Sequence, residues 1–449
     1  MSPDAIDQLR RQISGRVLLA GDDGYDTART VWNAMIDRSP TLIVQPANTQ
    51  DVVAAVRFAN DQDLPIAVRG GGHSAAGLAV CDDGLMIDLS AMRAVEVDPA
   101  QRTARAQGGA RWADFDAATQ AHGLATTGGA ISTTGIAGLT LGGGLGNLMR
   151  SYGLASDNLI SVELVTANAE VVTASATQNP DLFWGLHGGG GNFGVATMLE
   201  YQLHPVDQVL GGMLLFPVER APEMLRLYRK DTATAPDALA TSAALLFTPE
   251  GTPVCGLVFC YNGPIADGER ASAPYREFGT PIVDAVGPMP YTAIQSMLDA
   301  GFGPGFHSYW RAHFLTDLNE GGISTLVDHF SRAASPLSLV LIEHLGGAVG
   351  RVGRDETAFD HRDYEYNVAI IGRWAEPSQA DPNIAWTRAL SDALQPYAAG
   401  VYVNYLGAEE QADRLRAAYG DKKYARLVEL KNRYDPTNRF RFNQNIKPA

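Results

Sequence analysis

The stretch Arg69-Gly70-Gly71-Gly72-His73-Ser74 determines how we interpret the rest of the chain. It follows Pro65-Ile66-Ala67-Val68, a short apolar run that predicts a buried strand. Three consecutive glycines leave backbone amides uncovered and permit positive φ angles, so the turn can form an N–H-lined concavity for a diphosphate. The histidine would then lie beside whatever group the phosphates carry. On its own, the stretch is also consistent with a simple tight turn.

Two further glycine-rich segments lie downstream. In the first, 128–146, small residues at nearly every turn let the backbone lie against a flat or bulky group. Its Ser132, Thr133 and Thr134 are candidate helix caps whose neighbouring amides could bind an anion. Close packing of a helix on a sheet is the alternative explanation. Counted from the turn at 70–72, 128–146 is the second glycine segment and 184–195 is the third. The third segment leads into an alternating strand, and the three segments together indicate an extended dinucleotide.

Length and composition limit the classes of function. A chain of 449 residues exceeds the usual size of a single core, so two domains are expected. The 47 glycines cluster without a period, which excludes collagen-like and low-complexity sequences. A net charge of -15 argues against a nucleic-acid or anionic-membrane surface. Without a secretory signal or an apolar run of about 18 residues, we expect a cytoplasmic protein with no membrane span.

Cysteine and histidine patterns predict neither disulfides nor a metal site. The three cysteines, Cys81, Cys255 and Cys260, form no CxxC pair, and the histidines show no HExxH spacing. Cys255 and Cys260 lie at odd spacing in one predicted strand, so we expect buried thiols on opposite faces.

The N-terminal part alternates strands and helices. A strand over 41–44, a helix capped by Asn48 and the strand over 66–68 predict a compact βαβ unit. The glycine turn then lies at the carboxyl end of the second strand, where ligands bind in open α/β sheets. From Met86 to Ala106 the pattern predicts antiparallel strands, so the expected sheet is mixed.

After Pro205 the glycine clusters fade and a second domain is expected. Its strands should form an antiparallel sheet, flanked by helices, one face of which covers the cofactor. The last fifty residues change character again, with a predicted helix over 421–434. Within the second domain, helices are predicted over 222–229 and 291–298, and strands over 243–247, 254–261 and 337–343.

These motifs together resemble the berberine-bridge-enzyme-like branch of the vanillyl-alcohol-oxidase flavoprotein family. The similarity spans nearly the whole chain, in the expected order. It implies an α+β fold with a PCMH-type FAD-binding domain of two subdomains (1–205), a substrate domain (206–400) and a C-terminal segment (401–449) that returns to the FAD side. The matching segments are 69–74, 135–146, 152–158, 188–195, 402–405, 434–440 and 443–445.

The resemblance implies FAD as cofactor and His73 as the residue whose imidazole bonds to the flavin 8α-methyl carbon. Many family members have a second bond, from a cysteine to flavin C6, but the matching position here is Ile131, so we expect no cysteinyl link. The expected cofactor-binding residues are Arg69, Gly70, Gly71, Gly72, His73, Ser74, Gly77, Gly129, Thr133, Thr134, Gly135, Gly138, Gly142, Gly143, Gly144, Gly146, Asn147, Asp157, Gly194, Val195, Asn443 and Asn445.

Several residues are candidates for the catalytic base. A hydride is expected to leave substrate carbon for flavin N5 while a base takes a proton from an O–H or N–H group. Tyr405 is the first candidate, because the matching position in several relatives faces the flavin from a strand. Glu343 and His344 are next, but adjacent strand residues face opposite ways, so only one of them should reach the cavity.

Other candidates have an equally good structural explanation. His313 alternates with Tyr309 and Arg311 onto one face of a predicted strand and could line the pocket. His187 stands where relatives commonly have an arginine, and a structural contact is the favoured interpretation. Asp157 is expected to order the loop near the cofactor without chemistry of its own.

The main hypothesis is a covalent FAD oxidase, a monomer or small homo-oligomer, that oxidises a small organic molecule and passes the electrons to dioxygen. The alternatives are a flavin-dependent oxygenase or oxidative cyclase and a non-catalytic flavin-binding protein. A nicotinamide-dependent Rossmann protein is the weakest, because the strict GxGxxG context is missing. An alcohol, sugar, amine or phenolic substrate fits the aromatic residues equally well.

Overall fold

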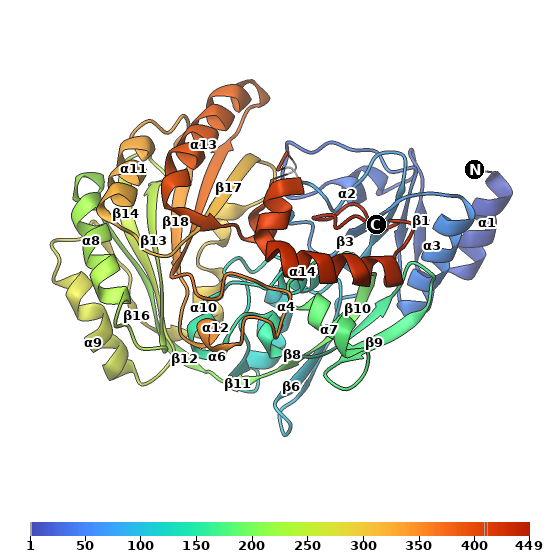
Figure 1. The fold of residues 1–449 in the computed structure, drawn as a ribbon, viewed down its shortest axis with the longest axis horizontal. Coiled ribbons are helices and arrows are strands. Elements are labelled where there is room, and N and C mark those ends of the chain that lie inside the picture. The colour runs from blue at the N-terminus through green and yellow to red at the C-terminus, as the bar shows by residue number, and fades with distance from the viewer. Residues whose placement is uncertain (1, 408, 411) are drawn as a thin grey trace.

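The computed structural model describes residues 2–407, 409–410 and 412–449. The fold is α+β, and Figure 1 shows two parts: one with the N-terminal strands and α14, and the other with a large sheet and its helices. Among the described residues, none of the helices combines the length and the apolar character needed to cross a membrane.

The first sheet carries the glycine turn. Its strands β2, β4 and β3 are parallel, and β1 pairs antiparallel with β2. The Asn48 side chain caps helix α3 (Thr49–Asp61) as predicted, and the helix packs against the sheet through apolar residues such as Val52 and Val56. Helix α1 (Pro3–Gln12) lies beside α3. The strands are β1 (Arg16–Leu18), β2 (Leu42–Gln45), β4 (Leu85–Asp88) and β3 (Ile66–Arg69), in that order.

The expectation that the strand at Met86 pairs in an antiparallel direction is wrong. Strand β4 lies between β2 and β3 and is parallel to both. All four of its residues are buried, which is typical of a central parallel strand rather than of a strand with one solvated face.

The second sheet is antiparallel and has the order β5-β6-β10-β8-β9. The hairpin of β5 and β6 is confirmed. Trp112, Phe115 and Tyr201 form an edge-to-face aromatic cluster in its core. The strands are β5 (Val95–Asp98), β6 (Thr103–Gln107), β10 (Val195–Gln202), β8 (Leu159–Val165) and β9 (Val171–Ser175); a short pair joins β7 (Leu124–Ala125) and β11 (His204–Pro205).

Helices α4, α5, α7 and α14 contribute to this second core. The C-terminal helix α14 is broken at Gly420 and packs against α7 (Figure 1). Short helices connect the remaining strands. The bounds are α2 (Tyr25–Arg29), α4 (Trp112–Gln120), α5 (Ile136–Leu141), α6 (Met149–Tyr152), α7 (Pro180–Leu186) and α14 (Ala412–Tyr434).

The third sheet has nine strands, all antiparallel. Cys255 and Cys260 are buried on opposite faces of β14, as predicted. Each packs into a different hydrophobic cluster, one on either side of the sheet. The strands are β15 (Val283–Asp284), β12 (Gln208–Pro217), β14 (Pro253–Tyr261), β13 (Leu239–Phe247), β18 (Leu339–His344), β19 (Tyr366–Trp374), β17 (His307–Leu315) and β20 (Ala398–Gly400), with β16 (Gly287–Pro290) beside β12.

One face of this sheet is covered by helices and the other faces the N-terminal part. Alternate residues such as Val340 and Ile342 of β18 and Val368 of β19 pack under the helices. The residues between them face the opposite way, toward the glycine-rich segments. The helices are α8 (Ala221–Thr232), α9 (Ile265–Arg276), α11 (Glu320–Phe330) and α13 (Ala380–Leu394), with α10 (Tyr291–Ser296) and α12 (Ala348–Arg351) nearer the N-terminal part.

Candidate active site

A large cavity lies where the three glycine-rich segments meet the nine-stranded sheet. Gly70 to Ala75, residues 129–139 and Gly190, Gly191 and Gly194 contribute to its lining. Trp310, Leu341, Glu343 and Ile371 line it from the sheet, and residues 403–405 and 440–444 line it from the C-terminal segment. The structure therefore brings all three predicted loops to one place.

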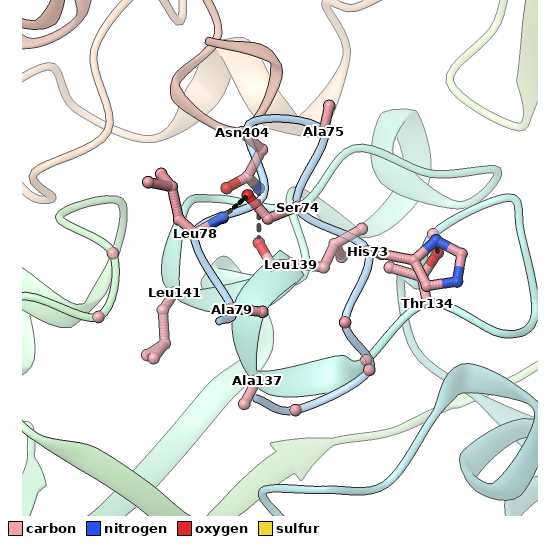
Figure 2. A pocket seen from close by; sticks show the side chains of 18 of the residues that line it. His73, Ser74, Ala75, Leu78, Ala79, Thr134, Ala137, Leu139, Leu141 and Asn404 are labelled. Atoms are coloured by element: carbon pink, nitrogen blue, oxygen red, sulfur yellow. Dashed lines mark hydrogen bonds between the residues drawn. The ribbon is translucent and has the colours of Figure 1, made fainter. Parts of the chain in front are cut away.

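The first two glycine segments touch through their backbones. A side-chain carbon on Gly71 would lie 2.2 Å from the amide nitrogen of Gly135, so only glycine permits this approach. Gly72 has φ of +71°, which favours glycine and turns the chain toward His73. In Figure 2 the side chains of His73 and Thr134 lie together at one end of this arrangement.

Other glycines in the lining leave space that no protein atom fills. A side-chain carbon added to Gly138 or Gly191 would meet no atom within 4 Å, although both residues line the cavity. The side-chain oxygen of Asn443, another lining residue, is buried without a hydrogen-bond partner. Bare backbone and an unpaired acceptor are what a bound flat, polar molecule would cover, so these residues fit a flavin dinucleotide.

The surroundings of His73 hold its ring in a defined position. Its Nε2 lies 2.9 Å from the Thr133 hydroxyl and its Nδ1 lies 3.5 Å from the Thr134 hydroxyl. The ring stacks on Trp32, with centroids 5.6 Å apart. Burial, with a smaller effect of the Arg111 guanidinium, lowers the pKa of His73 to about 4. The imidazole is therefore neutral at pH 7 and keeps a lone pair on one ring nitrogen.

The C-terminal segment is bonded to the glycine loops. Asn404 donates to the Leu139 carbonyl oxygen at 2.9 Å (Figure 2), and the Tyr402 hydroxyl accepts from the Gly144 amide at 3.0 Å. Further along, Asn443 donates to the Gly191 carbonyl oxygen at 3.2 Å. The end of the chain thus forms one wall of the cavity.

Glu343 and Tyr405 meet inside the cavity. Glu343 accepts a hydrogen bond from the Asn367 side chain at 2.6 Å, and its pKa is raised to about 7, chiefly by burial. Burial and the neighbouring Glu343 carboxylate raise the pKa of Tyr405 well above its usual value, so the phenol stays protonated at neutral pH. Of the two groups, Glu343 is therefore the one that can accept a proton near pH 7.

Three expectations about the candidate bases need correction. Tyr405 lies in a short 3-10 helix (Val403–Tyr405) and not in a strand. His344 faces the helix-covered side, beside Arg150 and Glu365, because it alternates with Glu343 along β18. His313 is also on the helix side, where its Nε2 lies 2.9 Å from the Ser391 hydroxyl of α13.

Tyr309 and Arg311 share the helix-facing side with His313, so the predicted common face is right but it does not line the cavity. Tyr309 accepts from Arg388 of α13, and Arg311 lies near Glu410. The intervening Trp310 is the residue of β17 that lines the cavity. His187 is a structural contact, since its Nδ1 lies 2.6 Å from the Phe183 carbonyl oxygen.

Four glycines near the carboxyl end of the second glycine segment, 128–146, lie outside the lining and pack against protein, whereas Leu141 and Leu145 beside them line the cavity. A side-chain carbon at Gly142 would lie 2.0 Å from the Asn404 side chain, and one at Gly146 would lie 1.8 Å from the Gly128 carbonyl oxygen. Close packing explains these glycines better than contact with a ligand does. The glycines with such close protein neighbours are Gly142, Gly143, Gly144 and Gly146.

Other expected cofactor contacts are also outside the lining. Arg69 donates to the Ala28 carbonyl oxygen at 2.9 Å, and Asp157 forms a buried ion pair with Arg362 at 2.7 Å. Asp157 also accepts from the Leu154 amide, in agreement with its expected role in ordering the loop. Thr133 is also outside the lining, and its hydroxyl lies 2.9 Å from Nε2 of His73. The others are Gly77 (packed on Ile36), Asn147 (bonded to Gln295), Val195 (buried in the first core) and Asn445.

The candidate caps of the second glycine segment are not caps. Helix α5 begins at Ile136, with Gly135 as its N-cap. Ser132 instead donates from its amide and its hydroxyl to Asp299, which belongs to a short 3-10 helix (Asp299–Phe302) beside the large sheet. This contact connects the 128–146 segment, whose Thr133 lies against His73, to the part of the molecule that contains the large sheet.

Sequence reasoning missed Trp32 and Asn404 as cavity residues. Trp32 is brought to the site by Asn33, whose side chain donates to the carbonyl oxygens of Ala75 and Ser308. Nothing local to Trp32 signals this long-range contact. Asn404 lies within the matched segment 402–405, so its position in the resemblance was the available signal.

Comparison with known proteins agrees with this architecture. The sequence model of FAD binding domains matches residues 40–175, and the model described as berberine and berberine like matches residues 401–447. An FAD-linked oxidoreductase of Dictyostelium discoideum is 34% identical over 99% of this chain and 97% of its own length. The (R)-6-hydroxynicotine oxidase of Paenarthrobacter nicotinovorans is 32% identical over 97% of both chains.

Solved structures show the same fold. The 6-hydroxy-D-nicotine oxidase of Arthrobacter nicotinovorans superposes with a TM-score of 0.89 at 28% identity, over 97% of this chain and 98% of the other. A berberine-bridge-enzyme-like protein of Physcomitrella patens has a TM-score of 0.90 at 23% identity over 99% of both chains, a likeness of fold alone. The chain is a flavoenzyme of the vanillyl-alcohol-oxidase type. It belongs to the berberine-bridge-enzyme-like FAD-linked oxidoreductases, as its sequence motifs predicted.

Proposed function

We propose that this protein is an oxidase whose FAD is bonded covalently through His73 and reoxidised by dioxygen to give hydrogen peroxide. The observation that carries the proposal is the position of His73. It follows the triple-glycine turn, lines the cavity and has a neutral imidazole between two threonine hydroxyls. A neutral ring nitrogen is the nucleophile that bonding to the 8α carbon requires.

The absence of a second covalent bond is part of the proposal. Ile131 lines the cavity but has no nucleophilic atom. All three cysteines are buried and outside the lining, and burial raises the pKa of each thiol to about 12. A thiol that remains protonated is a poor nucleophile.

Bound FAD would supply the hydride acceptor of the reaction. The protein's own contribution is to place the substrate against Glu343 and to remove a proton from its O–H or N–H group. The Asn367 amide fixes one carboxyl oxygen of Glu343, and the Tyr405 hydroxyl lies beside the carboxyl group. The aromatic rings of Trp32, Trp310 and Phe302 line the same cavity and would limit the access of water to a bound substrate.

The oxidase proposal is tested by measuring oxygen consumption and peroxide formation together, with a panel of alcohols, sugars, amines and phenolics. Equal amounts of oxygen consumed and peroxide formed are expected for at least one class. Incorporation of oxygen into the product would instead indicate an oxygenase. Turnover with an artificial electron acceptor but not with dioxygen would indicate a dehydrogenase.

A further inference from the structure

One short segment, residues 299–305, separates part of the cavity from solvent. Phe302 in this segment lines the cavity, and so does Leu298 just before it. Four residues of the segment are exposed and do not line the cavity, namely Ala300, Gly301, Pro304 and Gly305. The wall is therefore one chain thick here, whereas the large sheet that forms the neighbouring wall is backed by helices.

The two ends of this segment are fixed, but its middle is loosely packed. Helix α10 before it packs against α4 and β12, and Phe306 after it accepts from the Ala34 amide at 3.0 Å. A side-chain carbon added to Gly301, Gly303 or Gly305 would meet no described protein atom within 4 Å. Gly305 has φ of +89°, which favours glycine, but Gly301 and Gly303 are not in that region. Backbone freedom explains these two glycines better than packing does.

Single side chains from the surrounding walls hold the segment in place. The Trp32 indole N–H donates to the Phe302 carbonyl oxygen at 2.7 Å. Asp299 accepts from the Ser132 amide at 2.8 Å and from the Ser132 hydroxyl at 2.5 Å. These bonds come from separate elements and are not part of a strand ladder, so they can break without disrupting either sheet.

Arg373 supplies two more of the bonds that hold the segment. Its guanidinium donates to the carbonyl oxygens of Gly301 and Gly303 and lies over the Phe306 ring, 4.3 Å from the centroid. Burial lowers the pKa of Arg373 to about 10, and no carboxylate among the described residues opposes this shift. A buried cation without a counter-charge is unfavourable. Water that reaches Arg373 when the segment moves away therefore offsets part of the cost of the broken bonds.

We propose that residues 299–305 form a lid that opens to admit substrate to the cavity, and that the Phe302 ring limits the size of the molecules that enter. Opening breaks the bonds from Trp32 and Arg373 to the lid carbonyl oxygens and moves Phe302 out of the lining. Gly301 and Gly303 absorb the change in backbone angles. Entry precedes the reaction, so such a lid would serve an oxidase, an oxygenase or a dehydrogenase alike.

The lid is tested in flavin-loaded protein that carries Leu341→Cys, a change that puts a thiol inside the cavity. The thiol is labelled with a small reagent, methyl methanethiosulfonate, and with a bulky aromatic one, dithiobis(nitrobenzoic acid). The three native cysteines are buried, and labelling of the wild-type protein measures their background. Labelling needs neither substrate nor turnover, so its result is independent of the oxidase proposal.

The double change Gly301→Ala and Gly303→Ala leaves room for the closed lid but restricts its backbone. We expect it to slow labelling by both reagents about fivefold. Phe302→Ala should speed labelling by the bulky reagent at least tenfold and labelling by the small reagent less than threefold. Gly287→Ala is the matched control, because this glycine also faces open space but lies in β16, outside the lining, and it should leave both rates unchanged.

Three results would each overturn the lid. Unchanged labelling in the double alanine variant would show that entry does not use the freedom of these glycines. An equal gain for both reagents in Phe302→Ala would indicate general loosening of the protein instead of a limit on size. A thiol that reacts with neither reagent in any variant would show that molecules do not enter past this segment.

Discussion

At the scale of single residues, Glu343 is the group on which the proposed proton transfer depends. Replacing its carboxyl by an amide, in Glu343→Gln, removes the proton acceptor but keeps a partner for Asn367. We expect the rate of flavin reduction at saturating substrate to fall by about 10²–10⁴-fold. Flavin content should be unchanged. A rate within threefold of the wild-type value would show that another group is the base.

The raised pKa of Glu343 also predicts a pH dependence. The base acts in its deprotonated form, so the rate of flavin reduction should rise with pH through about 7 and then level off. The neighbouring phenols of Tyr402 and Tyr405 have raised pKa values and stay protonated over this range. A profile that is flat between pH 5 and pH 9, or one that falls, would contradict this assignment.

The same shift predicts an effect on stability. A carboxyl whose pKa rises from 4.5 in the unfolded chain to about 7 in the folded protein holds its proton longer when folded. Its contribution to the free energy of unfolding therefore decreases as pH rises between these values. We expect Glu343→Gln to gain stability relative to the wild type between pH 5 and pH 8, measured by urea denaturation. A constant difference over this range would contradict the shift.

At the scale of elements, the C-terminal segment should stabilise the second glycine loop. The Tyr402 hydroxyl accepts from the amides of Gly144 and Leu145 and from the Asn404 side chain. Tyr402→Phe leaves these donors buried without a partner, so we expect a loss of about 1–3 kcal/mol in the free energy of unfolding. Chemical denaturation measures it. Tyr397→Phe, a tyrosine on the far side of the large sheet, is the matched control.

Local patterns predicted many elements well. Asn48 and the apolar spacing after it gave helix α3, and alternation placed Glu343 and His344 on opposite faces of β18. Sequence did not reveal how β4 pairs, because pairing depends on strands distant in the chain. It also did not separate glycines that pack against protein, such as Gly142, from those that face open space, such as Gly138.

At the scale of the whole molecule, the site is assembled from both parts of the fold. Trp32 and Trp310 are in contact although far apart in sequence, and this could not be predicted from either neighbourhood. We propose that the chain divides into residues 1–205, 206–400 and 401–449, as the sequence suggested. The contacts of Ser132 with Asp299 and of Asn33 with Ser308 then lie between the first two parts.

The covalent bond between His73 and FAD is tested most directly by peptide mass spectrometry of the purified protein. After digestion with trypsin, His73 lies in the peptide from Gly70 to Arg93. We expect this peptide to carry the added mass of FAD, acid precipitation to leave the yellow colour with the protein, and His73→Ala to release the colour. An unmodified peptide from fully flavin-loaded protein would contradict the covalent bond, and a folded protein that binds no flavin would contradict the assigned function.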